Sequence, residues 1–151
     1  MTINVRPAQD SDVADIVRFN LAMAAETEDK GLNATVLERG VRALLANPID
    51  GYYLIAEREG EVAGSLMVTY EWSDWRCGRF HWIQSVYVDA NHRRRGVYQA
   101  MHAAVRDAAQ STPDCCGIRL YVERDNTGAQ ATYLALGMVE TDYKLFEEVF
   151  S

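Results

Sequence analysis

Three consecutive arginines, Arg93, Arg94 and Arg95, stand directly before Gly96 and a stretch with helical periodicity. The residues before them, 79–88, have a pattern typical of a strand. Strand, basic turn, glycine and helix together favour binding of phosphate, because the first amides of a helix have no partner within it and its dipole attracts an anion. Nearby arginines would add charge-assisted hydrogen bonds. A solvated basic turn is the alternative, and the three arginines alone favour neither.

The two common nucleotide-binding motifs are missing from the sequence: there is no G-x-x-x-x-G-K-[ST], and no G-x-G-x-x-G follows a strand. The chain is acidic, with a net charge of -7 and an isoelectric point near 4.9. This balance argues against nucleic acid as the main partner, since binding to its phosphates requires a broad basic face. A nucleic-acid-binding domain that uses the arginines is therefore the weakest hypothesis. The acidity is compatible with a cationic substrate, although most acidic proteins are acidic for solubility.

The 151 residues, 48% hydrophobic and 25% charged, predict one globular domain over residues 1–151. No apolar run approaches the ~20 residues of a membrane span, and the N-terminal segment lacks the apolar region of a secretory signal. The three cysteines form no disulfide framework and have no metal-ligand spacing with the histidines. We therefore expect a cytoplasmic protein with no metal and no membrane partner. The oligomeric state is open, with a homodimer as one option.

Hydrophobic periodicity divides the chain into strands and helices. The expected strands span residues 3–8, 52–57, 62–72, 79–88 and 117–122, with one or two more within 138–150. One expected helix begins after Asp10 or Ser11, and the others span residues 33–48, 97–108 and 126–137. The helix at 97–108 has its apolar residues along one face, and the last helix has Asn126 as its N-terminal cap and Gly137 as its C′ residue. This order predicts an α/β fold of the α+β type, with a mixed central sheet flanked by helices on both faces.

Two segments resemble a known family. VYVDANHRRRGVYQAMHAA is similar to the acyl-coenzyme A signature of the GNAT superfamily of N-acetyltransferases, Q/R-x-x-G-x-G/A, with Arg93 and Gly96 in its first two defined places. LYVERDNTGAQATYLALGM resembles the family's next segment, whose places are filled by Asn126, Ala129, Tyr133, Gly137 and Met138. Either motif alone is weak, but both in this order make a strong match. Tyr98 occupies the last signature place, where Gly or Ala is usual, so its side chain must point away from the pyrophosphate.

The resemblance implies the GNAT fold, with about 6–7 strands, about four helices and splayed strands at the acyl-coenzyme A site. It implies acetyl-coenzyme A as the acyl donor. The strand before the arginines would pair with pantetheine, the turn and helix amides would hold the pyrophosphate, and the second segment would hold the far side of the cofactor. The cofactor-binding residues so implied are Val86, Tyr87, Val88, Arg93, Arg94, Arg95, Gly96, Val97, Tyr98, Gln99, Asn126 and Ala129.

Acyl transfer to an amine needs a base, because a lysine-like amine has a pKa of about 10.4, and the leaving thiolate benefits from an acid. Tyr133 matches the family's tyrosine near the cofactor sulfur, so the resemblance implies that it is the acid. A core aromatic is the alternative interpretation. Many family members carry a glutamate on the strand before the signature, where this chain has Gln84. Glutamine cannot accept a proton, so Gln84 could only orient water or substrate.

The acceptor pocket of family members lies after the first helix and at the end of the third strand. The residues of this chain that fall there are Glu26, Glu28, Glu71, Trp82 and Gln84. A solvated surface carboxylate is the more common role for each glutamate. Trp72, Trp75 and Trp82 could form an aromatic wall for a cationic or aromatic amine, or they could pack in the core. His81 and His92 are interpreted as incidental.

The sequence thus predicts an acetyl-coenzyme A-dependent N-acetyltransferase that acts on a small-molecule amine or an exposed amino group. The alternative is a non-catalytic acyl-coenzyme A-binding or regulatory module with the same fold. The absence of the strand glutamate favours this alternative.

Overall fold

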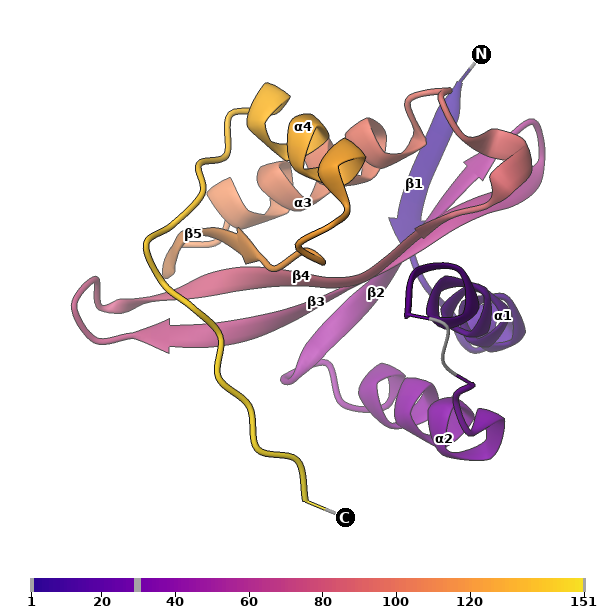
Figure 1. The fold of residues 1–151 in the computed structure, drawn as a ribbon, viewed down its shortest axis with the longest axis horizontal. Coiled ribbons are helices and arrows are strands. Elements are labelled where there is room, and N and C mark those ends of the chain that lie inside the picture. Colours follow the sequence, from indigo (N-terminus) through magenta and orange to yellow (C-terminus); the bar gives the residue numbers. More distant parts are fainter. Residues whose placement is uncertain (1, 29–30, 151) are drawn as a thin grey trace. The chain divides into compact units, whose positions relative to one another are not determined.

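The structure of the protein, a computed structural model, describes residues 2–28 and 31–150 (Figure 1). The chain divides into two compact units, Met1–Tyr121 and Val122–Ser151, which are taken in turn. Within the described residues, the first unit holds a five-stranded sheet and three α-helices, and the second unit holds one α-helix. That the chain forms one domain over residues 1–151 stays a prediction.

The strands of the first unit are β1 (Ile3–Pro7), β2 (Gly51–Arg58), β3 (Glu61–Ser73), β4 (Gly78–Val88) and β5 (Cys115–Leu120). They lie in the sheet in this same order. Neighbours run antiparallel from β1 to β4, whereas β5 is parallel to β4. The structure thereby confirms the predicted mixed sheet.

Helices cover both faces of this sheet, as predicted. α1 (Val13–Met23) and α2 (Ala34–Leu45) pack on one face, and α3 (Val97–Gln110) packs on the other (Figure 1). Short helical turns precede and follow α1, and a further one, Ala90–His92, joins β4 to the start of α3. No helix in the described part of the chain has the length and apolar composition needed to cross a bilayer.

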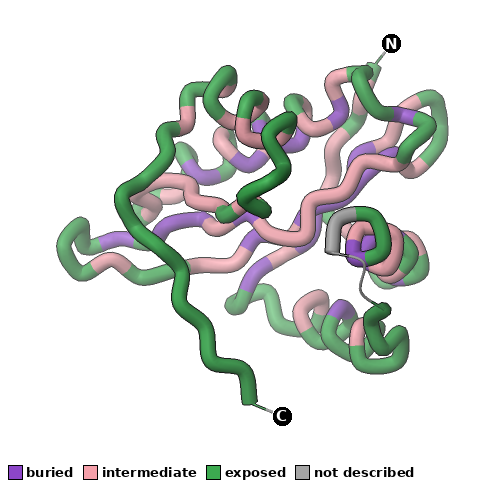
Figure 2. The backbone as a smooth tube through the Cα atoms, in the orientation of Figure 1, coloured by how far each residue is buried: buried purple, intermediate pink, exposed green. Residues whose placement is uncertain are grey.

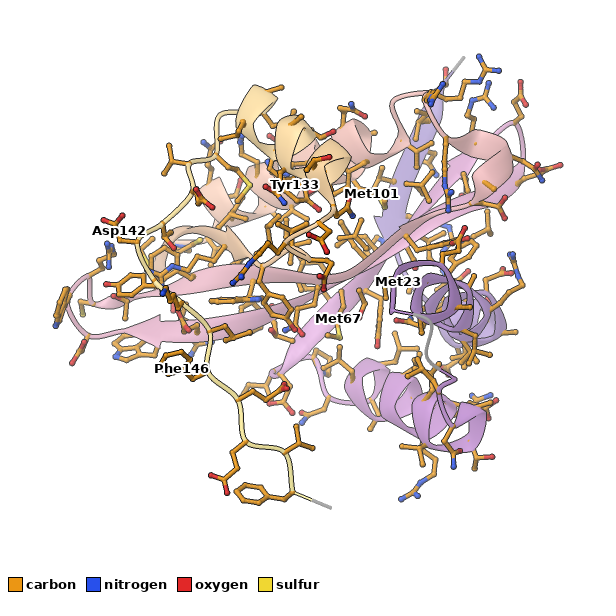
Figure 3. The ribbon with its side chains drawn as sticks, viewed as in Figure 1. Met23, Met67, Met101, Tyr133, Asp142 and Phe146 are labelled. Carbon is orange, nitrogen blue, oxygen red and sulfur yellow. The ribbon has the colours of Figure 1, made fainter. Side chains whose placement is uncertain are left out.

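Two layers of side chains form the core, one beneath each helical layer. The buried residues are coloured purple along the backbone in Figure 2. The layer under α1 and α2 consists of Val13, Ile16, Val41, Tyr53 and Ile55. The layer under α3 includes Leu66, Val68, Ile83, Val97, Met101 and Val105, of which Met101 is labelled in Figure 3. Val97, Met101 and Val105 are four positions apart, so the predicted apolar stripe of α3 is the face that meets the sheet.

The second unit holds α4 (Thr127–Ala135) with both of its predicted caps. The Asn126 side chain accepts a hydrogen bond from the Ala129 amide at 3.2 Å. At the other end Gly137 has φ +95°, and the Met138 amide donates to the Tyr133 carbonyl at 3.1 Å. This left-handed residue and its bonds form a Schellman motif, which ends the helix where the sequence predicted.

The predicted strands within residues 138–150 are not formed, so the described sheet has five strands instead of six or seven. The segment is rich in apolar and aromatic residues, but a strand also requires a hydrogen-bonded neighbour, which composition does not supply. Val139, Phe146 and Phe150 are accordingly exposed. β5 also begins at Cys115 and ends at Leu120, two residues before the predicted bounds at each end.

Candidate functional site

The strands β4 and β5 separate part of the way along β4. Their pairing ends at Ile83 and Leu120, whereas β4 continues to Val88 beside β3. At the point of separation Ser85 has φ +53°, and the register between β3 and β4 shifts, which is the geometry of a β-bulge. The backbone of Val86–Val88, on the side away from β3, therefore has no partner in β5. This confirms the splayed strands that the fold class implied.

The turn after β4 presents unpaired amides. Gly96, the N-cap of α3, has φ +82°, and Arg94 has φ +61°. A Cβ at Gly96 would meet only the Ile3 side chain, at 4.0 Å, so the left-handed backbone and not lack of space requires glycine there. No side chain caps α3, and the first amides of a helix have no partner inside it. These amides are available to an anion.

Two of the three predicted arginines are available to the same anion. Arg94 and Arg95 are exposed, and no ion pair joins either one to another residue within 2–28 or 31–150. Their positive charge adds to that of the helix N-terminus. The combination of amides, helix dipole and two guanidinium groups fits a pyrophosphate in charge and in hydrogen-bond donors.

Arg93 is engaged differently. Its Nη2 lies 3.1 and 3.2 Å from the two carboxylate oxygens of Glu26, and its Nε donates to the Val88 carbonyl at 3.0 Å. Its guanidinium also lies 5.3 Å from the ring centroid of Tyr87. A hydrogen bond from Tyr87 and the pairing with Arg93 lower the pKa of Glu26. Glu26 is therefore a weak base. Its ion pair with Arg93, a residue of the cofactor signature, holds it at the end of β4.

His92 anchors the turn, a role that the sequence interpretation missed. Its ring is buried, with Nδ1 3.3 Å from Arg58 Nη1 and Nε2 3.0 Å from Glu61 Oε2. An arginine can only donate, so Nδ1 is the acceptor and Nε2 carries the hydrogen that Glu61 accepts. The turn before Arg93 is thereby fastened to the β2–β3 hairpin. No local sequence pattern signals these contacts.

Tyr98 points away from the amides of α3, as the signature requires. Its hydroxyl lies 3.1 Å from Nδ1 of His102, one turn further along the helix. Its ring meets the His102 ring edge-on at 5.6 Å between centroids. Burial lowers the pKa of His102, so its ring is neutral. The Tyr98 side chain thus packs along the helix, and its backbone amide stays at the open end.

Three of the predicted acceptor residues share one face of the sheet. Glu71 pairs with Phe80 in the β3–β4 ladder, and Trp82 and Gln84 follow at alternate positions of β4. Beyond Trp82, toward the end of β4, α1 and α2 cover this same face of the sheet. Met67, which pairs with Gln84, packs beneath those helices (Figure 3). The Gln84 amide donates to Thr69 Oγ1 at 2.6 Å.

Arg119 of β5 and Tyr121, directly after this strand, complete the face, and neither was predicted from the sequence. Arg119 donates to Glu71 Oε1 at 2.6 Å, and its guanidinium carbon lies 3.7 Å from the ring centroid of Phe80. The Tyr121 and Trp82 rings have centroids 6.0 Å apart. The one available signal was Arg119 itself, a charged residue inside an otherwise apolar strand pattern.

The three tryptophans do not form one wall. Trp72 alternates to the opposite face from Glu71 and is 58% exposed, and Trp75, in the β3–β4 turn, is 85% exposed. Trp82 alone faces the Gln84 side of the sheet. The side chain of Glu28, the remaining acceptor candidate, lies outside the described residues.

The remaining predicted site residues lie on α4 of the second unit. Asn126 and Ala129 form its N-terminal cap, and Tyr133 follows four residues later (Figure 3). Burial raises the pKa of the Tyr133 hydroxyl, so this group keeps its proton at neutral pH. Among the residues described, no group of three or more His, Cys, Asp or Glu side chains is arranged to hold a metal ion.

A model of the acetyltransferase (GNAT) family matches residues 20–138. A possible acetyltransferase from Clostridium difficile 630 is 42% identical, with a TM-score of 0.90 and full coverage of both chains. No curated protein matches the chain.

Two more distant structures share the fold. A predicted acetyltransferase from Clostridium acetobutylicum, solved with acetyl-CoA, is 19% identical over 97% of this chain and 96% of its own, with a TM-score of 0.78. Glucosamine-6-phosphate N-acetyltransferase from Arabidopsis thaliana is 19% identical over 98% and 99%, with a TM-score of 0.75. The family match over most of the chain, with the splayed strands and the open α3 terminus, makes this protein a member of the acetyltransferase (GNAT) family.

Proposed function

We propose that the protein transfers an acetyl group from acetyl-coenzyme A to a primary amine, on a small molecule or as an exposed amino group. The observation that carries this proposal is the open backbone edge of β4 directly before the uncapped N-terminus of α3. The edge of β4 offers backbone hydrogen bonds to an extended chain, and the N-terminus of α3 offers hydrogen-bond donors to an anion. Coenzyme A has both parts, in that order.

The residues present fit the cofactor. The backbone of Val86–Val88 would pair with pantetheine, and the amides from Arg94 to Gln99 would bind the pyrophosphate. Arg94 and Arg95 would reach its oxygens, while Arg93 keeps the turn in place through Glu26 and the Val88 carbonyl. The resemblance to the family also assigns Asn126 and Ala129, of the second unit, to cofactor binding. When bound, acetyl-coenzyme A supplies an activated thioester.

Side chains of the protein would transfer the protons and orient the amine. The lowered pKa of Glu26 makes it a poor base, and its pairing with Arg93 gives it a structural role. Gln84 would orient the amine, because its Nε2 is held by Thr69 and its carbonyl oxygen can accept from an N–H. Tyr133, which matches the family's tyrosine, would donate a proton to the leaving sulfur. Burial raises the pKa of its hydroxyl, which keeps the group protonated but makes it a weaker acid.

A non-catalytic acyl-coenzyme A-binding module is the second candidate, favoured by Gln84 at the place of the strand glutamate. Thiol release from acetyl-coenzyme A, measured across a panel of primary amines, separates the two. Amine-dependent release supports the enzyme. Coenzyme A binding without any such release supports the binding module, and no binding of coenzyme A contradicts both.

A further inference from the structure

A pocket of about 180 Å³, called the His81 pocket below, lies at the end of β4 away from the splay. Three parts of the first unit form it: the connection between α2 and β2, the paired strands β3 and β4, and the connection between α3 and β5. Its lining includes Ile49, Tyr70, Arg79, His81, Thr112 and Asp114.

The His81 pocket is separate from the places proposed for the acyl donor and the acceptor. Thr112 follows the C-terminal end of α3, whose 14 residues give a helix about 21 Å long, and the anion-binding turn lies at the other end. Tyr70 and His81 pair in the β3–β4 ladder on the face that α3 covers, whereas Trp82 and Gln84 lie on the opposite face.

His81 has a buried ring nitrogen without a partner. The residue is 4% exposed, and its Nδ1 has no hydrogen-bond partner among the residues that the structure describes. A buried polar atom left unpaired costs free energy, so nearly all such atoms in folded proteins are paired. The χ2 torsion of histidine is broad, so a small rotation of the ring presents Nδ1 to a group in the pocket.

A hydroxyl group is the partner that suits this nitrogen best. Burial lowers the pKa of His81, so its ring is neutral, with one nitrogen a donor and the other an acceptor. A hydroxyl both donates and accepts, so it can pair with Nδ1 in either tautomer.

The charged residues of the pocket already balance each other. Arg79 Nε lies 3.4 Å from Asp114 Oδ2, and the Arg79 amide donates to the Asp114 carbonyl at 2.8 Å. A neutral ligand leaves this ion pair intact, whereas a charged one would have to compete with it. The pocket therefore favours a ligand without charge.

The size and the walls of the pocket fit one aromatic ring. An apolar cavity of about 150 Å³ holds one benzene molecule, so about 180 Å³ accommodates a six-membered ring with one or two further heavy atoms. The Tyr70 and His81 rings already meet edge-on at 5.0 Å between centroids, and Arg79 lies 5.9 Å from the Tyr70 centroid. A further ring can make the same kinds of contact with these side chains.

We propose that the His81 pocket binds a small neutral phenol, with its ring against Tyr70 and Ile49 and its hydroxyl hydrogen-bonded to Nδ1 of His81. This site is additional to the proposed acetyl transfer and does not depend on it.

The test is an NMR titration of the protein with three ligands of similar size: 4-methylphenol, toluene, which lacks the hydroxyl, and 4-methylcyclohexanol, which lacks the aromatic ring. The Ile49 δ-methyl signal reports binding in the pocket, and the nitrogen-15 signal of His81 Nδ1 reports the hydrogen bond. We expect Kd for 4-methylphenol to be lower than for either other ligand by about tenfold, the size expected for one buried hydrogen bond. The Nδ1 signal should shift with 4-methylphenol and not with toluene.

His81→Phe keeps a ring but removes Nδ1. It should abolish the preference for 4-methylphenol over toluene. The free energy of unfolding of the ligand-free protein should stay equal or rise, because an unpaired buried polar atom has been replaced by an apolar one.

The matched control is His102→Phe. His102 is 1% exposed, but its two ring nitrogens lie 3.1 Å from the Tyr98 hydroxyl and 3.4 Å from Arg106 Nη2. This variant should lower the free energy of unfolding and leave the ratios of Kd among the three ligands unchanged.

Ile49→Ala is a second variant, and it places the fold at little risk because Ile49 is 73% exposed. It should weaken binding of all three ligands by similar factors, whereas Val36→Ala on α2, at a residue 58% exposed, should weaken none. Equal Kd values for 4-methylphenol and toluene, a stationary Nδ1 signal or an unchanged preference in His81→Phe would overturn the inference. Binding of none of the three ligands would also overturn it, and would assign Nδ1 to ordered water.

Discussion

Nη2 of Arg93 lies within 3.2 Å of both carboxylate oxygens of Glu26, 67 positions earlier in the chain. The same guanidinium holds the carbonyl of Val88, the last residue of β4, through Nε. One side chain thus joins the segment after α1 to the strand edge and to the anion-binding turn. This arginine of the signature is therefore engaged in structural contacts, whereas Arg94 and Arg95 remain exposed.

Because Arg93 is engaged in structural contacts and Arg94 and Arg95 are exposed, their replacement should weaken ligand binding in two different ways. Arg93→Gln should weaken binding of both coenzyme A and a pantetheine fragment without the nucleotide, because it loosens the strand edge as well as the turn. Arg94→Ala combined with Arg95→Ala should weaken coenzyme A alone, by about tenfold or more for each charge-assisted hydrogen bond lost. Calorimetric titration of each variant with coenzyme A and with the pantetheine fragment distinguishes the two effects. Identical patterns for the two variants would contradict the assignment.

Gly96 should be required by its backbone conformation and by the approach of the anion. Gly96→Val forces a branched residue into a left-handed conformation, at a cost of about 1–2 kcal/mol or more in the free energy of unfolding. It should also remove most of the stabilisation by coenzyme A, which is about 2.7 kcal/mol at 100 times Kd. Denaturant unfolding with and without coenzyme A measures both effects.

The control for this variant is Gly40→Val on α2, where a Cβ meets nothing within 4 Å. Its response to coenzyme A should equal that of the parent protein. A full response in Gly96→Val would mean that the anion site lies elsewhere.

Tyr133→Phe keeps the ring but removes the hydroxyl whose pKa is raised by burial. If that hydroxyl protonates the leaving sulfur, kcat should fall by about 10²–10⁴-fold while the Kd for coenzyme A changes little. The measurement is kcat on the best amine, with Kd determined in parallel. An unchanged kcat would assign Tyr133 to packing alone.

The ion pair of Asp12 with Arg6 should make stability depend on pH. Asp12 is buried and accepts from two guanidinium nitrogens at 2.8 and 2.9 Å, and hydrogen bonding by Arg6, with help from the Gln9 amide, lowers its pKa. A carboxyl with a lowered folded-state pKa stabilises the fold above its ordinary pKa of about 3.9, and loses that contribution as the pH falls through the folded-state value.

Asp12→Asn should therefore lower the free energy of unfolding by about 1.5–3 kcal/mol at neutral pH. The difference from the parent should shrink toward zero in acid, below the folded-state pKa. Urea unfolding at a series of pH values tests this. A difference that stays constant down to the acid limit would mean that Asp12 acts by packing and not by its charge.

Local patterns predicted the elements that depend on local interactions. The apolar spacing of α3, the Asn126 cap and the left-handed Gly137 were all found from sequence, because each reflects contacts within a few residues. The prediction of strands within residues 138–150 was wrong, since an apolar and aromatic composition does not provide a pairing partner. The same reason explains why Arg119 was missed: its contact with Glu71 spans 48 positions and depends on the register of three strands.

β4 offers two different kinds of surface at the same place. Its main chain forms the free edge beside Val86, whereas the side chains of Trp82 and Gln84 project from the adjoining face. Backbone groups are the same for every amino acid, so under the proposed function the strand edge that would hold the acyl donor should tolerate sequence change better than the side chains that would hold the acceptor. We therefore expect related proteins to diverge in the amine they accept through a few substitutions on this strand, with no change in how the acyl donor is held.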